Sequence, residues 1–192
     1  VDDGVMPVNE TSNLVTKIPT FTGNIDPRVM PINNGRKWDE PFDIEIHGFQ
    51  LVPHKTDMED FLDPKELKEK YYKELKTLVK QHVGASDVYI FDHTLRTGDD
   101  EKRKKELLRE PVKRVHNDYT EWSGPQRVRD LFPKEAEKLI SRRFSIIQVW
   151  RPVQKILDKD PLALCDARSV EKSDLIIAER RYPDRVGHTY QI

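Results

Sequence analysis

Hydrophobic residues recur every three or four positions between residues 63 and 84, which is the spacing of one face of an α-helix. The apolar stripe consists of Leu67, Tyr71, Leu75 and Leu78. Asp63 is a suitable N-cap, Pro64 fits the first helical position, and Glu66 could close a capping box. Gly84 ends the pattern. This segment is the clearest helix that the sequence predicts, and its Lys-rich opposite face is expected to be solvated.

Elsewhere, apolar and polar residues alternate in short runs, which is typical of half-buried β-strands. The runs that we interpret as strands are 42–52, 86–96, 112–120, 143–153, 161–170, 174–183 and 188–192. Several short strands separated by turn residues favour an all-β sandwich or barrel, with helices packed outside it.

Three further segments complete the predicted order of elements. Residues 97–111 are highly charged and are expected to form a mobile loop, whereas 123–143 reads as helical turns broken at Pro133. Residues 1–41 mix Pro, Gly, Asn and Thr with short apolar stretches, which favours an extended N-terminal arm or a pair of short strands. We therefore expect an arm over 1–41 and a single folded domain over 42–192.

Composition narrows the classes of protein that need to be considered. The chain has 192 residues, of which 35% are charged, and its net charge is −1, so it lacks the basic excess of a nucleic-acid binder. No apolar run approaches the roughly 18 residues of a membrane span, and no signal-peptide pattern opens the chain. The single Cys165, in an apolar setting, is interpreted as a buried structural thiol of a cytoplasmic protein.

The candidate chemistry lies in "VKRVHNDYT", where His116 and Asp118 are two residues apart. In a strand this spacing places both side chains on one face, and imidazole and carboxylate are both ligands of divalent metals. With six His and 34 acidic residues in the chain, such a pair is expected about once by chance. A surface His–Asp pair in a loop is therefore the alternative.

Several other chemistries lack a motif in this sequence. There is no G-x-x-x-x-G-K-[ST] loop, no G-x-G-x-x-G turn and no G-x-S-x-G elbow. A zinc clip would need a second Cys. Nucleotide binding, a Rossmann-type methyltransferase and a serine-hydrolase mechanism are therefore disfavoured.

Five blocks occur in an order that resembles a known family: "YIFDHTLR", "VKRVHNDYT", "FSIIQVWRPV", "PLALCDARSV" and "ERRYPDRVGHTY". From about Phe42 to the last residue, the chain is similar to the oxygenases related to gibberellin desaturase, the AsaB-type hydroxylase/desaturase and CmcJ. The resemblance implies an α+β fold with a double-stranded β-helix (jelly-roll) core and added helices, incomplete at the C-terminus.

The resemblance also implies a reaction. The family uses Fe(II), 2-oxoglutarate and O2 to hydroxylate or desaturate small molecules of specialised metabolism. A small-molecule substrate is therefore expected, with no nucleic-acid or membrane partner, and a homodimer is left open. His116 and Asp118 would be two of the three iron ligands.

In the family pattern the third ligand, a distal His, and the basic residue that holds 2-oxoglutarate come in a later block. This chain stops at Ile192, before that block. We expect it to be a fragment of a longer enzyme, and the alternative is a truncated, non-catalytic relative that acts as a binding or scaffold protein. His188 is expected to be an ordinary polar strand residue.

Weaker candidates surround the proposed iron pair. Gln148 could bind the co-substrate and Trp150 could wall the substrate pocket, if their shared face of the predicted strand 143–153 lines the barrel; plain core packing is the alternative. On this register both side chains point toward the iron pair, and Arg151 points away.

Two arginines and a tyrosine complete the set of candidates. Arg151 could bind a carboxylate of the substrate and Arg168 one of the co-substrate, the alternative being structural salt bridges to an acid such as Asp166. Tyr119, next to the expected metal strand, could touch the substrate.

Overall fold

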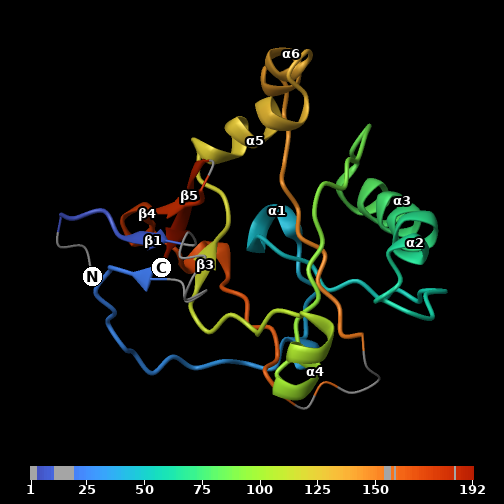
Figure 1. The fold of residues 1–192 in the computed structure, drawn as a ribbon, viewed down its shortest axis with the longest axis horizontal. Helices are drawn as coiled ribbons and strands as arrows, with labels where there is room; N and C mark the ends of the chain where they lie inside the picture. Colours follow the sequence, from blue (N-terminus) through green and yellow to red (C-terminus); the bar gives the residue numbers. More distant parts are fainter. Residues whose placement is uncertain (1–3, 11–19, 154–156, 158, 184) are drawn as a thin grey trace. The chain divides into compact units, whose positions relative to one another are not determined.

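The computed structural model of the chain describes residues 4–10, 20–153, 157, 159–183 and 185–192 (Figure 1). The chain divides into two compact units. The first comprises Val1–Gly35, Lys113–Ile146 and Arg168–Ile192, and the second comprises Arg36–Val112 and Ile147–Ala167. His116 and Asp118 belong to the first unit.

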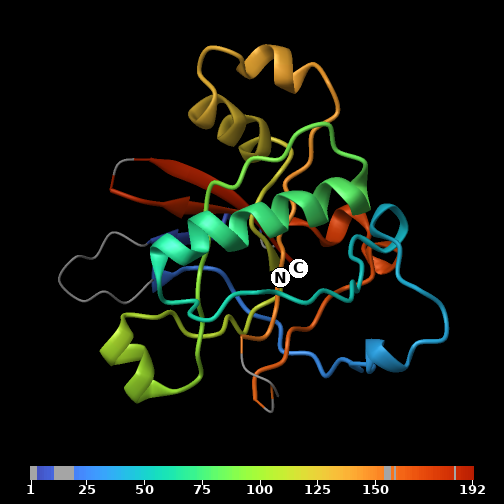
Figure 2. The same ribbon diagram turned by 90° about the vertical axis from the view of Figure 1, so that its right-hand side faces the viewer.

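A five-stranded sheet organises the first unit, in the order β2-β1-β4-β5-β3. Its strands are β1 (Val8–Glu10), β2 (Thr20–Phe21), β3 (His116–Asn117), β4 (Ile176–Arg181) and β5 (Val186–Gln191). β4 and β5 form an antiparallel hairpin, the long pair of red arrows in Figure 2, and β1 lies parallel to β4. The strands expected in 174–183 and 188–192 and the short strands expected near the N-terminus are confirmed, and the strand expected in 112–120 is reduced to two residues.

The register of the sheet assigns side chains to its two faces, because residues paired directly across strands project to the same side. His116 pairs with Gln191, Ala178 with Thr189, and Asn9 with Arg180. Since side chains alternate along each strand, all six of these lie on one face, which we call the His116 face. Asn117, Tyr190 and His188 lie on the other face. Ala178 and Thr189 are buried at the centre of the His116 face.

The His116 face is concave. Phe21, on the edge strand β2, belongs to this face because it pairs with Asn9. Arg114 precedes the opposite edge strand β3, yet its guanidinium carbon lies 4.3 Å from the centroid of the Phe21 ring. Side chains from the two ends of a five-stranded sheet can meet in this way only if the sheet curls toward that face.

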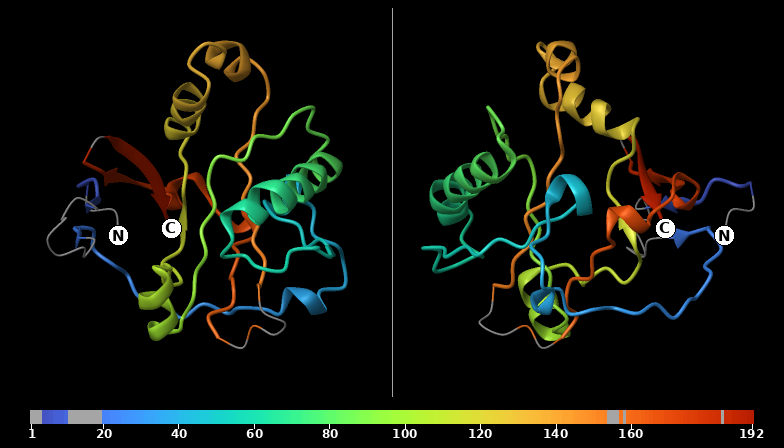
Figure 3. Two further views of the ribbon diagram at one scale, coloured as in Figure 1. Left: turned by 45° about the vertical axis from the view of Figure 1, so that its right-hand side comes forward. Right: turned by 180° about the vertical axis from the view of Figure 1, so that it is seen from behind.

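Two short helices follow β3, α5 (Ser123–Leu131) and α6 (Ala136–Ile140), drawn in yellow to orange in Figure 3. α5 stops just before Phe132, because the residue preceding Pro133 is disfavoured in the helical conformation. The predicted helical segment broken at Pro133 is therefore confirmed. Val128 of α5 and Ala136 of α6 are buried in this unit.

The second unit is built around one long helical segment. α2 (Pro64–Glu66), a π-helical turn η2 (Leu67–Tyr71) and α3 (Tyr72–Val83) follow one another without a break. Asp63 accepts a hydrogen bond from the Lys65 N–H, and Gly84 ends the segment in the left-handed conformation, with φ at +62°. The predicted helix over 63–84 is therefore confirmed.

One detail of the predicted helix start, the capping box, is wrong. Glu66 does not reach back to Asp63 in a capping box; its two carboxylate oxygens accept hydrogen bonds from the N–H groups of Glu59 and Asp60. Lys70, one turn further on, donates to the same carboxylate at 2.7 Å. Together these contacts lower the pKa of Glu66 to about 2, with the Lys70 hydrogen bond as the largest cause.

Two segments predicted as a strand and a loop contain helices. α1 (Ile44–His47) replaces the strand expected in 42–52, and α4 (Asp100–Glu106) lies within the loop expected in 97–111. In both, an aspartate immediately before the helix accepts hydrogen bonds from the first turn. Local capping thus favours a helix in both segments, against the alternating pattern of 42–52 and the high charge of 97–111.

The prediction of strands in 86–96, 143–153 and 161–170 is also wrong. Their described residues are irregular, apart from an isolated bridge between Arg96 and Arg109 and the 3-10 turn η3 (Ala167–Ser169). Two more 3-10 turns are η1 (Gly35–Lys37) and η4 (Lys172–Asp174).

Cys165 lies in the irregular segment 161–170 and is exposed, so the interpretation as a buried thiol is wrong as well. In the described part of the chain, every helix is too short or too polar to cross a membrane.

Candidate metal centre

His116 and Asp118 come together at the end of the short edge strand β3. The Nε2 atom of His116 lies 3.3 Å from the Oδ1 atom of Asp118, and both side chains are partly shielded from solvent. Two donor atoms that bind one ion at about 2.1 Å and at right angles lie about 3 Å apart. The spacing of this pair therefore suits two neighbouring ligands of one metal.

The orientation of the imidazole also suits metal binding. Nδ1 of His116 lies 2.9 Å from the carbonyl oxygen of Arg114, so it is the nitrogen that donates a hydrogen bond. Nε2 is then free to face Asp118. A backbone carbonyl that fixes the tautomer in this way is the usual second partner of a metal-binding histidine.

Two acceptors aimed at one another require a cation between them. A proton can take that place: the hydrogen bond to Asp118 raises the pKa of His116, the Arg114 carbonyl adds to the rise, and burial and the charge of Arg180 oppose it. A divalent ion can take the place of this proton, since metal ligands bind in their deprotonated forms. Hence the donor pair fits a metal such as iron, although two ligands do not complete a facial triad.

A third ligand is not found among the described residues, where no group of three His, Cys, Asp or Glu side chains could hold a metal ion. His188 lies on the opposite face of the sheet from His116. Its ring packs against Trp122 with 4.5 Å between the ring centroids. His188 therefore points away from the His116–Asp118 pair.

The segment that follows Asp118 is fixed to the sheet by a small hydrogen-bond network. The N–H of Thr120 donates to Oγ of Ser123, and the N–H of Ser123 donates back to Oγ1 of Thr120. Ser123 Oγ also donates to the carbonyl of His188, at 2.8 Å. Both hydroxyl residues are buried, so this network anchors the end of β3 to β5 and begins α5.

Sequence reasoning missed Thr120 and Ser123, because the T-x-x-S spacing lacks the Glu or Gln of a capping box and gives no clear signal. Tyr119, a predicted substrate contact, follows Asp118 directly. Its hydroxyl oxygen accepts a hydrogen bond from Nε of Arg127, at 3.3 Å.

The other predicted site residues are divided between the two units. Arg168 lies exposed in η3 of the first unit. Gln148, Trp150 and Arg151 belong to the second unit; Gln148 is exposed and Trp150 is 45% exposed. The expected direction of Gln148 and Trp150, toward the iron pair, stays a prediction.

Arg151 is the best packed of these residues. Its guanidinium lies over the rings of Phe61 and Tyr71, with its carbon 5.9 and 5.7 Å from their centroids. Its Nη1 atom is 3.4 Å from Nδ1 of His54. Burial raises the pKa of Tyr71, and Arg151 opposes that rise. Within its unit, Arg151 is thus part of the packing against the long helix.

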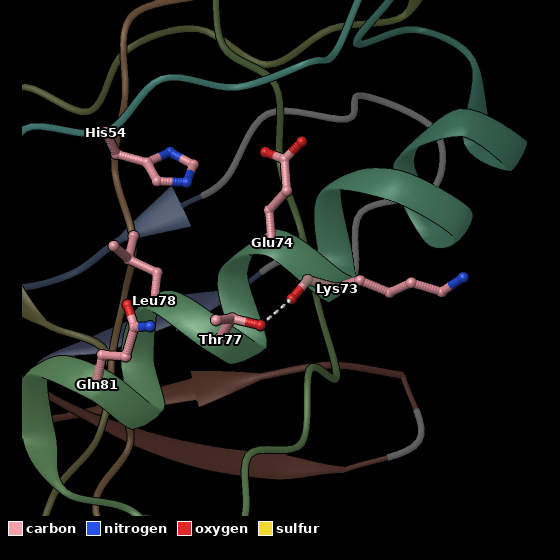
Figure 4. A pocket seen from close by; sticks show the side chains of 6 residues that line it. All are labelled: His54, Lys73, Glu74, Thr77, Leu78 and Gln81. Carbon is pink, nitrogen blue, oxygen red and sulfur yellow. Dashed lines mark hydrogen bonds between the residues drawn. The ribbon is translucent and has the colours of Figure 1, made fainter.

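An open hollow of about 400 Å³ lies beside α3 in the second unit (Figure 4). It is lined by His54, Lys73, Glu74, Thr77, Leu78 and Gln81. None of the predicted site residues lines it. Glu74 is already bonded to Thr56 and to the N–H of Asp57, so the hollow offers no second candidate for the chemistry.

Comparison with known proteins places the chain in a family. The sequence profile of the family described as "Oxidoreductase/YMDC permease-like domain" matches residues 1–192. The chain belongs to this family. A hydroxylase/desaturase, CTB9, from Cercospora beticola is 33% identical over 181 residues, which are 86% of this chain and 56% of that protein. The alpha-ketoglutarate-dependent dioxygenase tstK from Talaromyces stipitatus is 31% identical over 170 residues, covering 85% of this chain and 61% of its own length.

A solved structure shares the fold of this family member. It is that of the iron and alpha-ketoglutarate-dependent endoperoxidase NvfI, which superposes with a TM-score of 0.73 over 97% of this chain and 70% of its own chain, at 19% sequence identity. The resemblance to oxygenases noted in the sequence is therefore confirmed. The chain spans little more than half the length of the curated relatives described above.

Proposed function

We propose that the protein is an Fe(II)- and 2-oxoglutarate-dependent dioxygenase, which hydroxylates or desaturates a small specialised metabolite in the cytoplasm. The observation that carries the proposal is the pair formed by His116 Nε2 and Asp118 Oδ1, 3.3 Å apart on a concave sheet face. Relatives named as dioxygenases or hydroxylase/desaturases support the reaction class. Because they support an enzyme, we favour it over a scaffold protein.

Each residue of the centre has a distinct task in this proposal. Neutral His116 binds through Nε2, while the Arg114 carbonyl holds its Nδ1–H and keeps the ring in place. Asp118 offsets part of the charge of the ion. Thr120 and Ser123 fix the backbone that carries Asp118. When bound, Fe(II) with 2-oxoglutarate and O2 would supply the oxidising power needed to remove hydrogen from an unactivated C–H bond.

The proposal extends to the rest of the fold. The curled sheet of the first unit would be part of a jelly-roll core. The oxygenase domain would begin near residue 42, and the arm before it would add β1 and β2 to this sheet. Tyr119, Trp150 and Arg151 would contact the substrate, and Gln148 and Arg168 the co-substrate. The described residues do not supply the third ligand, so it must come from elsewhere in the functional protein. A small-molecule substrate is proposed as the partner, and a homodimer is compatible with this arrangement.

The test measures conversion of 2-oxoglutarate to succinate by the full-length protein with Fe(II) and O2. His116→Ala should form no succinate, because it lacks one metal ligand. Asn117→Ala is the control and should keep wild-type turnover, since Asn117 lies between the two ligands but on the opposite face of the sheet. Succinate formation by His116→Ala at the wild-type rate would refute the assignment. If Mn(II) binds normally to the wild type but no succinate forms with any added metabolite, the scaffold alternative is correct.

A further inference from the structure

Arg114 contacts the candidate metal centre with its backbone and the N-terminal part of the sheet with its side chain. Its carbonyl oxygen lies 2.9 Å from Nδ1 of His116. Its guanidinium carbon lies 4.3 Å from the centroid of the Phe21 ring, which is carried by the edge strand on the other side of the same sheet. A single residue therefore connects a metal ligand with a ring near the N-terminus of the chain.

The backbone around Arg114 does little to hold its carbonyl in place. Among the described residues, 111–114 lie outside any helix or strand and form no backbone–backbone hydrogen bond. Arg114 is exposed, so burial in a core does not fix it either. The attraction between its guanidinium and the Phe21 ring is then the contact that ties this residue to the sheet.

Phe21 suits this task because its own ring is closely held. The N–H of Thr22 donates to the carbonyl of Val8 at 3.0 Å, which fixes the backbone beside the ring. A Cβ atom at Gly23 would lie 2.5 Å from Cζ of Phe21 and 2.9 Å from Cβ of Pro7, so a glycine is needed to make room for the ring. The ring therefore offers the guanidinium a face in a fixed position.

The position of the Arg114 carbonyl matters because the neutral His116 ring has one proton and two acceptors beside it. The carbonyl faces Nδ1, and the carboxylate of Asp118 faces Nε2 at 3.3 Å. A carboxylate is the stronger acceptor of the two. If the carbonyl moved away, the proton would stay on Nε2, where it blocks a metal ion. Nε2 can therefore act as a ligand only while the carbonyl is held in place.

We propose that Phe21 is a positioning residue of the metal centre. Its ring holds the Arg114 side chain, which keeps the Arg114 carbonyl on Nδ1 of His116 and leaves Nε2 available for the ion. The metal part of this inference rests on the proposed function, whereas the position of the proton can be measured without metal. The N-terminal segment that adds β1 and β2 to the sheet thus takes part in the centre without supplying a ligand.

The experiment locates the proton on the His116 ring. Full-length protein with isotope-labelled histidine is studied in EDTA, at the alkaline end of a pH series, where the imidazole is neutral. The nitrogen chemical shifts of His116 give the ratio of the Nδ1–H form to the Nε2–H form. Mn(II) affinity is then measured on the same variants by electron paramagnetic resonance.

Phe21→Leu keeps an apolar side chain but removes the aromatic face. It should lower the ratio of the Nδ1–H form to the Nε2–H form by about three-fold or more, and weaken Mn(II) binding about three- to ten-fold. Phe21→Tyr should keep both values near wild type, since its ring also attracts a guanidinium. Phe144→Leu, at an exposed ring of the same unit, is the control and should behave as wild type.

Arg114→Gln tests the same contact from the other side, with its exposed neighbour Lys113→Gln as the matched control. It should repeat the effect of Phe21→Leu, and the double variant should be no worse than either single variant, because both changes break one contact. Gly23→Ala leaves both partners in place but displaces the ring, so it should shift the ratio in the same direction. Since Arg114 is exposed, Arg114→Gln keeps the test valid should Phe21→Leu fail to fold.

The inference is overturned if Phe21→Leu and Arg114→Gln keep the wild-type ratio of the two forms, or if their effects add in the double variant. Weak Mn(II) binding by the wild type would refute the proposed function, and a changed ratio in Phe21→Leu would still show that Phe21 orients His116. Intact Mn(II) binding with an unchanged ratio refutes only this inference.

Discussion

Arg151 and Arg180 are both partly buried arginines whose Nε atoms lack a hydrogen-bond partner, yet their surroundings differ. In the second unit, Arg151 lies over two aromatic rings and reaches His54 with another nitrogen. In the first unit, Arg180 lies beside unsatisfied Asn9 on the face that carries His116. Aromatic faces attract a cation, and Arg151 lies over two of them, whereas Arg180 lies over one, the Tyr182 ring, whose centroid is 5.5 Å from its guanidinium carbon. The contrast teaches that an arginine in contact with two rings and a histidine stabilises its unit more than an arginine beside an unsatisfied amide does.

The largest effect should come from the centre of the first unit. Asp118→Ala is expected to weaken Mn(II) binding by more than about 100-fold. Losing a direct metal ligand lowers the affinity more than losing a residue that only hydrogen-bonds to a ligand. The thermal midpoint without metal should change little, since Asp118 is partly exposed. Titration of Mn(II) by electron paramagnetic resonance measures the affinity, and a large drop in thermal midpoint would mean that Asp118 is a structural residue.

In the second unit, a change at Tyr71 should lower stability and leave metal binding intact. Its ring is 8% exposed and packs edge-on against Phe61, with 5.2 Å between the centroids. Tyr71→Ala should lower the free energy of unfolding by about 3 kcal/mol, as other large-to-small core changes do. Urea unfolding measures this, and Tyr89→Ala, at an exposed ring, is the control. Loss of Mn(II) binding in folded Tyr71→Ala would contradict the separation of roles.

The two arginines themselves provide the sharpest comparison. Arg151→Leu should cost about 1 kcal/mol of stability, because the cation–π contacts with Phe61 and Tyr71 are lost. Arg180→Leu should cost less, because the loss of its single ring contact, with Tyr182, is offset by the removal of a nitrogen without a hydrogen-bond partner. Urea midpoints of both variants decide the matter. Equal losses in the two would show that Arg180 is structural too.

The smallest effect concerns Glu66 and acid. Hydrogen bonds from Lys70, Asp60 and Glu59 lower its pKa from 4.5 to about 2. A carboxyl with a lowered pKa in the folded state adds stability that is present above its unfolded pKa and is lost as the pH falls through the folded value. Glu66→Gln should therefore flatten the fall in thermal midpoint between pH 4.5 and pH 2. A decline of the same slope as in wild type would contradict the lowered pKa.

These contrasts also explain how much the sequence could predict. Helix 63–84 and the His116–Asp118 pair depend on neighbours within a few residues, and local patterns are enough to find them. The β4–β5 hairpin pairs two segments that are adjacent in the chain. Residues 143–153 alternate just as well, but no strand in the described part of the chain pairs with them, and the same pattern forms no strand.

Arg180 could not be found by such reasoning. Its place beside Asn9 and on the face of His116 depends on β1 pairing with β4 and β5 pairing with β3, which join segments far apart in the sequence. A shift of one residue in either register would send Arg180 to the opposite face and bring Arg181 in its place. The side chains of a site can therefore be predicted where they are close in sequence, but not where only the register of a sheet brings them together.

The parallel pairing of β1 with β4 has a consequence for how the protein is made. Asn9 leaves the ribosome ahead of its partner Arg180, which is 171 residues further on. At roughly 5–20 residues per second, β1 waits about 10–35 s for its neighbour. The long helix of the second unit can form during that interval. Metal loading must then follow formation of that helix, because β3, which carries His116, pairs with β5 near residue 190. Slowing elongation after residue 112 should therefore delay metal uptake without delaying formation of the helix.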